Sequence, residues 1–118
     1  MSAGPWTLTT RAGSQVDRQH VETIEEALAA LERSVEELQS DASREEVRFI
    51  GRRIEPARQV VARIELAGPG SRGRVVRGGV DLRGDGSAEA FTGRVRRALV
   101  ERHGGESAPQ ALARALST

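Results

Sequence analysis

The chain has 118 residues and a formal net charge of +1, and this length fits one domain. It contains no cysteine, so disulfide bonds, thiolate metal sites and a cysteine nucleophile are all excluded. No stretch approaches the roughly 18 apolar residues of a membrane span, and the start of the chain lacks the charged-then-apolar order of a secretion signal. We therefore expect a cytoplasmic protein with a single α+β domain over residues 1–118.

The apolar content predicts a thin core. Valine, isoleucine, leucine and phenylalanine together number 26, just above the level of roughly 20% of a chain below which disorder becomes the better expectation. Only three residues are aromatic, so small aliphatic side chains have to fill the interior. Such a core buries a modest apolar area. We therefore expect either a marginally stable monomer or a homo-oligomer that buries more apolar surface, and a dimer is the first expectation.

The first segments predict a strand followed by a loop. Residues 6–12 are rich in β-branched side chains and place Trp6, Leu8 and Thr10 on one side, as in a half-buried strand. The polar stretch over residues 15–20 has no apolar period, which indicates a loop.

Residues 23–40 carry the clearest pattern in the sequence, that of an amphipathic helix. Thr23 and Glu26 have the spacing of a capping box, in which the threonine hydroxyl accepts a hydrogen bond from the amide three residues on. The exposed positions are mostly glutamate, so we expect one buried side and one acidic side. The apolar stripe consists of Ile24, Ala27, Leu28, Leu31, Val35 and Leu38.

Beyond this helix the apolar period changes to two. Residues 47–54 predict one strand, residues 60–67 a second and residues 74–83 a third, with a glycine-rich loop over residues 68–73. Short links between strands imply antiparallel neighbours. The three segments therefore predict an antiparallel meander.

Residues 87–103 are compatible with two structures. As a helix, the segment carries an apolar stripe through Phe91 and stops at Gly104. As a strand, residues 87–95 close a hairpin through the glycine-rich turn before them. We favour the helix, although Gly93 inside it costs about 1 kcal/mol relative to alanine.

A short helix is predicted near the C-terminus, where Ser107 and Gln110 form a second capping box, and residues 104–118 are interpreted as a helical extension. The complete order is strand, helix, three strands, helix and short helix. It predicts an α+β fold with an antiparallel sheet of about four strands and the helices on one face. Over residues 6–103 this order is similar to that of the amino-terminal domain of ribosome hibernation factors, without a shared motif and with an acidic helix where that family has basic ones.

The charges are divided along the chain. Residues 1–43 carry three arginines and eight acidic residues, whereas residues 44–103 carry fourteen arginines and eight acidic residues. All 18 basic residues are arginine, which we attribute first to codon usage, because alanine, glycine and valine are abundant as well. The inward strand positions are apolar, so the arginines of the predicted strands are left to the opposite sheet face. These are Arg48, Arg63, Arg77 and Arg83, interrupted by Glu65 and Asp81.

We expect the arginine-bearing surface to bind a partner and not to catalyse a reaction. The hypothesis is a non-catalytic protein-protein interaction or self-assembling module, such as an adaptor, an immunity or antitoxin-like protein or an assembly subunit. The alternative is an RNA- or ribosome-associated protein, because arginine binds phosphates through forked contacts. A solvated face with cross-strand ion pairs is the simplest interpretation. The predicted binding surface consists of Arg48, Arg63, Arg77, Arg83, Arg94, Arg96 and Arg97.

Three motifs have simpler structural explanations. Ser14, Asp17 and His20 are close in sequence without the geometry of a catalytic triad, and the two histidines form no metal set. Residues 68–73 lack the Gly-Lys-Ser/Thr ending of a phosphate-binding loop. Residues 81–92 contain the tripeptide Arg-Gly-Asp. The same residues have part of the spacing of a calcium-binding loop, but an arginine stands at one of the ligand positions. A turn between two elements explains both features. We therefore expect no cofactor and no metal.

Overall fold

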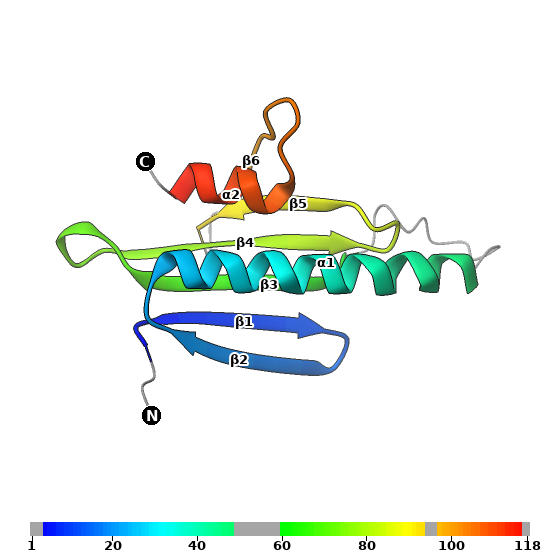
Figure 1. Cartoon of the computed structure of the whole chain (residues 1–118), viewed down its shortest axis with the longest axis horizontal. Helices are drawn as coiled ribbons and strands as arrows, with labels where there is room; N and C mark the ends of the chain where they lie inside the picture. Colours follow the sequence, from blue (N-terminus) through cyan, green and yellow to red (C-terminus); the bar gives the residue numbers. More distant parts are fainter. Residues whose placement is uncertain (1–3, 49–59, 94–96, 117–118) are drawn as a thin grey trace.

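The computed structural model describes residues 4–48, 60–93 and 97–116, which form six strands and two α-helices (Figure 1). The helices are α1 (Ile24–Arg48) and α2 (Ala108–Leu116), and a short 3-10 turn, η2 (Ser71–Gly73), joins the third strand to the fourth. The strands are β1 (Trp6–Ala12), β2 (Gln15–Val21), β3 (Val60–Pro69), β4 (Val75–Arg83), β5 (Ala88–Thr92) and β6 (Ala98–Val100).

These strands lie in one antiparallel sheet in the order β2-β1-β3-β4-β5-β6. β2 and β3 both run antiparallel to β1, and α1 makes the connection between them. From β3 onward each strand pairs with the next one in the chain. The predicted α+β class with an antiparallel sheet is therefore confirmed, with six strands in place of about four.

Both helices pack on the same face of the sheet, and the core lies between the two layers. α1 runs along the sheet over β1, β3 and β4, and α2 packs on β4 and β5 (Figure 1). Trp6 points inward as predicted, and its ring occupies the space that a Cβ at Gly68 would fill. Most other core side chains are small and aliphatic: Leu8, Ala27, Ala30, Leu31, Val35, Ala62, Ile64, Leu66, Val80, Leu82, Ala90, Ala108, Ala111 and Leu112.

Side-chain caps fix the starts of both helices as predicted. The Glu26 amide donates to Thr23 Oγ1 at 3.1 Å. At α2 both halves of the capping box form: the Gln110 amide donates to Ser107 Oγ at 3.3 Å, and the Ser107 amide donates to Gln110 Oε1 at 2.8 Å. These bonds satisfy amides that have no partner inside the helix. Leu31 is fully buried, which confirms the predicted helix phase.

The loop predicted over residues 15–20 is wrong, because this segment forms β2. β2 pairs with β1 over its whole length, from Gln15 opposite Ala12 to Val21 opposite Trp6. It lies at the edge of the sheet, and all of its side chains but the last are exposed. An edge strand with two solvated faces needs no apolar alternation, so its sequence carries no period-two signal.

The helix favoured for residues 87–103 is also wrong, and the strand alternative is the one that forms. β5 lies in this segment and follows a turn in which Gly86 has a φ of 87°. Ala90 faces the core, whereas Phe91 faces the other side of the sheet. The alternation of apolar and polar residues is weak in this segment because the core side of β5 carries alanines. Their small side chains give little apolar contrast with the residues between them.

α1 is longer than predicted and continues to Arg48. Val47 and Arg48, which the sequence pattern assigns to a strand, belong to the helix, and residues 49–54 lie outside the described residues. No glycine or proline stands in residues 40–46 to stop the helix earlier. In the described residues the order is two strands, a helix, four strands and a helix, which differs from the predicted order on which the similarity to the ribosome hibernation factors rested.

Candidate functional site

The sheet face opposite the helices, which we call the open face, carries most of the charged side chains of the sheet. No element of the described residues packs against it. Strand alternation assigns side chains to this face by register. From β2 to β6 they are Val16, Arg18 and His20; Thr7, Thr9 and Arg11; Val60 and Val61 at a bulge, Arg63, Glu65, Ala67 and Pro69; Val75, Arg77, Gly79, Asp81 and Arg83; Glu89 and Phe91; and Leu99.

A groove of about 600 Å³ crosses the open face over β1, β3 and β4. The surface is hollowed here because three neighbouring residues of β1 and β3 have short side chains: Thr7, Thr9 and Ala67. They form the floor of the groove. The threonine hydroxyls can donate and accept hydrogen bonds. Grooves of this volume hold a few side chains of a ligand or partner.

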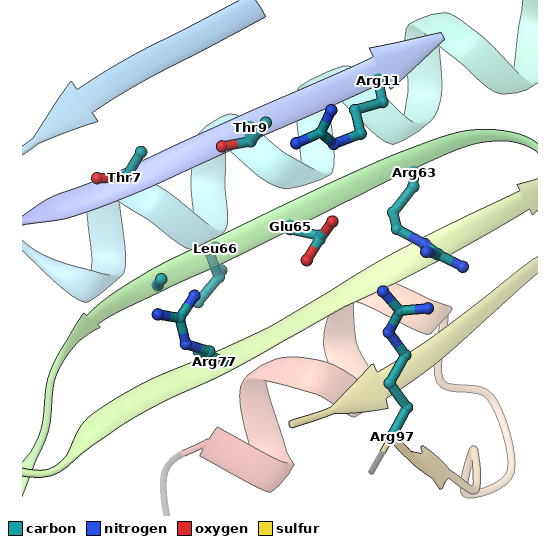
Figure 2. Close-up of a pocket in the computed structure, with 9 residues that line it drawn as sticks. Thr7, Thr9, Arg11, Arg63, Glu65, Leu66, Arg77 and Arg97 are labelled. Carbon is teal, nitrogen blue, oxygen red and sulfur yellow. The ribbon is translucent and has the colours of Figure 1, made fainter. Parts of the chain in front are cut away.

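Four arginines and one glutamate surround this groove. In Figure 2 Arg11 extends from β1, Arg63 from β3 and Arg77 from β4, and Arg97 reaches in from the segment before β6. Glu65 lies between them. Within the described part of the chain, the side chains of Arg11 and Arg77 form no hydrogen bond or ion pair. Their guanidinium groups are available to an external anion.

Phe91 lies on the open face and is nevertheless only 2% exposed. Two guanidinium groups cover its ring: the carbon of Arg97 lies 5.1 Å and that of Arg63 lies 5.5 Å from the ring centre. Gly79 pairs with Phe91 across the strands, and a Cβ there would meet the ring at 2.8 Å. The missing side chain of Gly79 makes room for the ring. Phe91 in turn holds Arg63 and Arg97 beside the groove through cation-π contacts.

Two cations of the open face, Arg63 and Arg83, are neutralised by carboxylates of the same chain. Arg63 forms a two-pronged ion pair with Asp81, directly opposite on β4, and the second prong joins Nη2 to Oδ2 at 3.1 Å. The hydrogen bond to Asp81 is the main reason why the pKa of Arg63 is raised above its ordinary value. Arg83 Nη2 lies 2.8 Å from Glu89 Oε1. These cross-strand pairs leave Arg11, Arg77 and Arg97 as the main source of positive charge around the groove.

Exposed aliphatic side chains flank the groove. Val16 and Val61 lie at one end of the open face, where Arg11 pairs with Val16. Val75 lies at the other end, beside the β3–β4 turn, and Leu99 lies on the edge strand β6. Their exposed fractions run from 36% for Val61 to 67% for Leu99. Protein interfaces are enriched in arginine, and their buried centres are more apolar than the surrounding surface.

The structure brings together four of the seven arginines that the sequence predicts as a binding surface. Arg63, Arg77, Arg83 and Arg97 lie on the open face. Arg48 belongs to α1 and not to the sheet. The other two predicted residues, Arg94 and Arg96, lie outside the described residues.

Sequence reasoning missed two arginines of the open face, Arg11 and Arg18. Arg11 alternates with the inward residues of the first predicted strand, so its outward position was available from the period-two pattern alone. Arg18 belongs to β2, for which the sequence predicts a loop, and its place opposite Thr9 follows from the pairing of β2 with β1. No signal in the sequence places Arg18 on this face.

The serine, aspartate and histidine near the N-terminus do not converge. Ser14 lies in the β1–β2 turn, and Asp17 and His20 stand on opposite faces of β2 because they are three positions apart in a strand whose side chains alternate. The ring of His20 shares a 3.3 Å hydrogen bond with the hydroxyl of Thr7. Among the described residues no group of three or more histidine, aspartate or glutamate side chains could hold a metal ion.

The Arg-Gly-Asp tripeptide forms part of the β4–β5 turn. Asp85 Oδ1 accepts hydrogen bonds from the hydroxyl of Ser87 at 2.6 Å and from its amide at 2.9 Å. These bonds, the hydroxyl first, lower the pKa of Asp85. Gln39 of α1 donates to the carbonyl of Gly86 at 2.9 Å and ties the turn to the helix. The carboxylate of this tripeptide therefore stabilises its own turn.

Neither helix of the described residues is long and apolar enough to cross a membrane. Comparison of the chain with protein-family models, with characterised proteins and with solved structures found no match.

Proposed function

We propose that this protein is a non-catalytic module that binds another protein, or a second copy of itself, through its open face. One observation carries the proposal: this face combines unpaired arginines with exposed valines and a leucine, and no described element covers it. Arginine is enriched in protein interfaces, and the buried centre of an interface is more apolar than the rest of a protein surface. Cytoplasmic adaptors, immunity or antitoxin-like proteins and assembly subunits are modules of this kind.

The chemistry of the open face favours a protein over RNA. Proteins that bind single-stranded RNA stack bases on aromatic side chains, and the aromatic residue of this face, Phe91, is covered by two arginines. The carboxylate of Glu65, which forms no ion pair among the described residues, also lies on the face and would repel a phosphate placed beside it. The RNA alternative is therefore the second candidate.

Self-association is one form of the proposed function. A closed dimer needs a surface that is complementary to itself. The open face has this property in part, because it carries arginines and carboxylates side by side with exposed valines such as Val61 and Val75. We therefore include a homodimer in the proposal, to be measured by light scattering after size exclusion across the micromolar range.

The experiment that tests the proposed function is photo-cross-linking in the cells that make the protein. A photo-reactive amino acid is placed at Thr9 or Val75 on the open face, and at Glu32 or Glu36 on the exposed side of α1 as matched controls. We expect discrete protein adducts, including a dimer where the copies associate, from the two open-face positions and not from the controls. Adducts to RNA, or equal adducts from both sides of the molecule, would contradict the proposal.

A further inference from the structure

The four arginines around the groove differ in how they are held. Arg63 is fixed by Asp81 and by the ring of Phe91, and Arg97 is fixed by the same ring. Side chains that are ordered before binding lose less conformational entropy when a ligand arrives. Arg11 and Arg77 have no partner among the described residues, so an external anion does not have to displace one. The groove therefore offers both fixed and unpaired cations.

We propose that the groove binds an acidic segment of a partner protein, whose glutamate or aspartate side chains pair with Arg11, Arg77 and Arg97. This inference rests on the proposed function and names the chemistry of the partner. Arginine pairs with carboxylates through two parallel hydrogen bonds, which gives the contact a defined geometry. Because Arg11 lies in β1, Arg77 in β4 and Arg97 in the segment before β6, separate carboxylates of one acidic segment can each pair with an arginine.

Glu65 determines which acidic ligands the groove accepts. Its carboxylate lies among the arginines and, within the described residues, forms no ion pair of its own. The Glu65 carboxylate would repel a chain that is charged at every position, RNA and octa-glutamate alike, whereas a natural acidic segment can place an uncharged side chain or an amide group there. Thr7 and Thr9 at the floor can bond to such a peptide backbone.

The partner that we infer is a different protein and not a second copy. Among the described residues, the exposed side of α1 is acidic, and it lies on the far side of the sheet from the groove. A contact between the groove of one copy and the α1 surface of the next would be a head-to-tail interface, and such an interface forms an open polymer unless the copies close into a ring. An acidic segment of a different protein can neutralise the arginines of the groove without forming a polymer of this chain.

The test is the binding of a fluorescently labelled octa-glutamate peptide to the full chain at low salt and at about 150 mM salt, by anisotropy. We expect Arg11→Ala and Arg77→Ala each to weaken binding about threefold and the double variant about tenfold, since partly exposed ion pairs are lost. We expect Glu65→Gln to strengthen binding about threefold, because a repulsive charge is removed. Arg33→Ala, on the acidic side of α1, removes the same charge away from the groove and is the control.

The outcomes separate this inference from the proposed function. No peptide binding at low salt, an equal loss in Arg33→Ala, or tighter binding of a single-stranded RNA octamer would overturn the acidic-segment inference. If the octa-glutamate result is negative while the open-face cross-links to protein persist, the proposed function stands and the chemistry of the partner is different. Circular dichroism of each variant confirms that a lost affinity is not a lost fold.

Discussion

Arg63 and Asp81 join β3 to β4 on the open face through an ion pair with two hydrogen bonds, and the same guanidinium covers Phe91. The pair satisfies the charge of Arg63 inside the subunit, as a simple cross-strand pair does. It also holds that side chain at the border of the groove. The arginine surface is thus partly a structural network and partly a set of unpaired cations.

The first prediction concerns this pair. A double-mutant cycle of Arg63→Ala and Asp81→Ala should give a coupling free energy of unfolding of about 1 kcal/mol, because both side chains keep some exposure and solvent screens the pair. Chemical denaturation of the four proteins measures it. Additive effects of the two substitutions would show that the ion pair does not stabilise the fold.

Phe91→Ala should destabilise the protein by about 3 to 5 kcal/mol, as for other buried aromatic side chains, since it leaves Gly79 uncovered. It should also weaken octa-glutamate binding, because Arg63 and Arg97 lose the ring that orders them. Denaturant unfolding and anisotropy, at a temperature where the variant stays folded, check the two effects. An unchanged affinity would mean that the ring does not order the arginines.

Leu31→Ala should cost about 2 to 5 kcal/mol by leaving a cavity between α1 and the sheet, where Leu31 is fully buried. Domains of this size have a total stability of about 5 to 15 kcal/mol, so the loss is a large fraction of it. The neighbouring exposed residue supplies the control: Glu32→Ala should change the free energy of unfolding by less than about 0.5 kcal/mol.

Gly79→Val should destabilise the sheet by about 1 to 3 kcal/mol or more, because a side chain at Gly79 would collide with the ring of Phe91 and the carbonyl of Ile64. Gly104→Ala is the matched control, since a Cβ at Gly104 meets no atom within 4 Å. Thermal unfolding of both variants measures the difference. Equal melting temperatures would refute the close approach at Gly79.

A pH-dependent contribution is expected at the start of α2. Arg114 donates to Glu106 Oε2 at 3.0 Å, and this bond is the main reason why the pKa of Glu106 is lowered. A carboxylate with a lowered pKa stabilises the folded state above its ordinary pKa of about 4.3, and the contribution is lost as the pH falls through the folded-state pKa. Carbon-detected NMR titration should show the pKa of Glu106 rising toward the ordinary value in Arg114→Ala. If the pKa of Glu106 is the same in Arg114→Ala as in the unsubstituted protein, this ion pair does not contribute to the stability of α2.

The helices and the central strands could be predicted from the sequence because the apolar residues of each element recur at the spacing typical of a helix or of a strand. The capping residues Thr23 and Ser107 mark helix starts, and the alternation around Ile64 and Val80 marks β3 and β4, since those strands bury one side under the helices. The α+β class follows from these elements alone. Strands without a buried apolar side, above all β2, leave no such trace.

The groove and its cations depend on tertiary structure. Chain alternation places Arg11 and Arg77 outward, but strand order is what sets them on one face with Glu65 between them. The sequence likewise could not show that Arg63 is paired with Asp81 or that Phe91 is buried on the solvent side, because both depend on register between strands. Local periodicity determines which way a side chain points, and long-range pairing determines which side chains it meets.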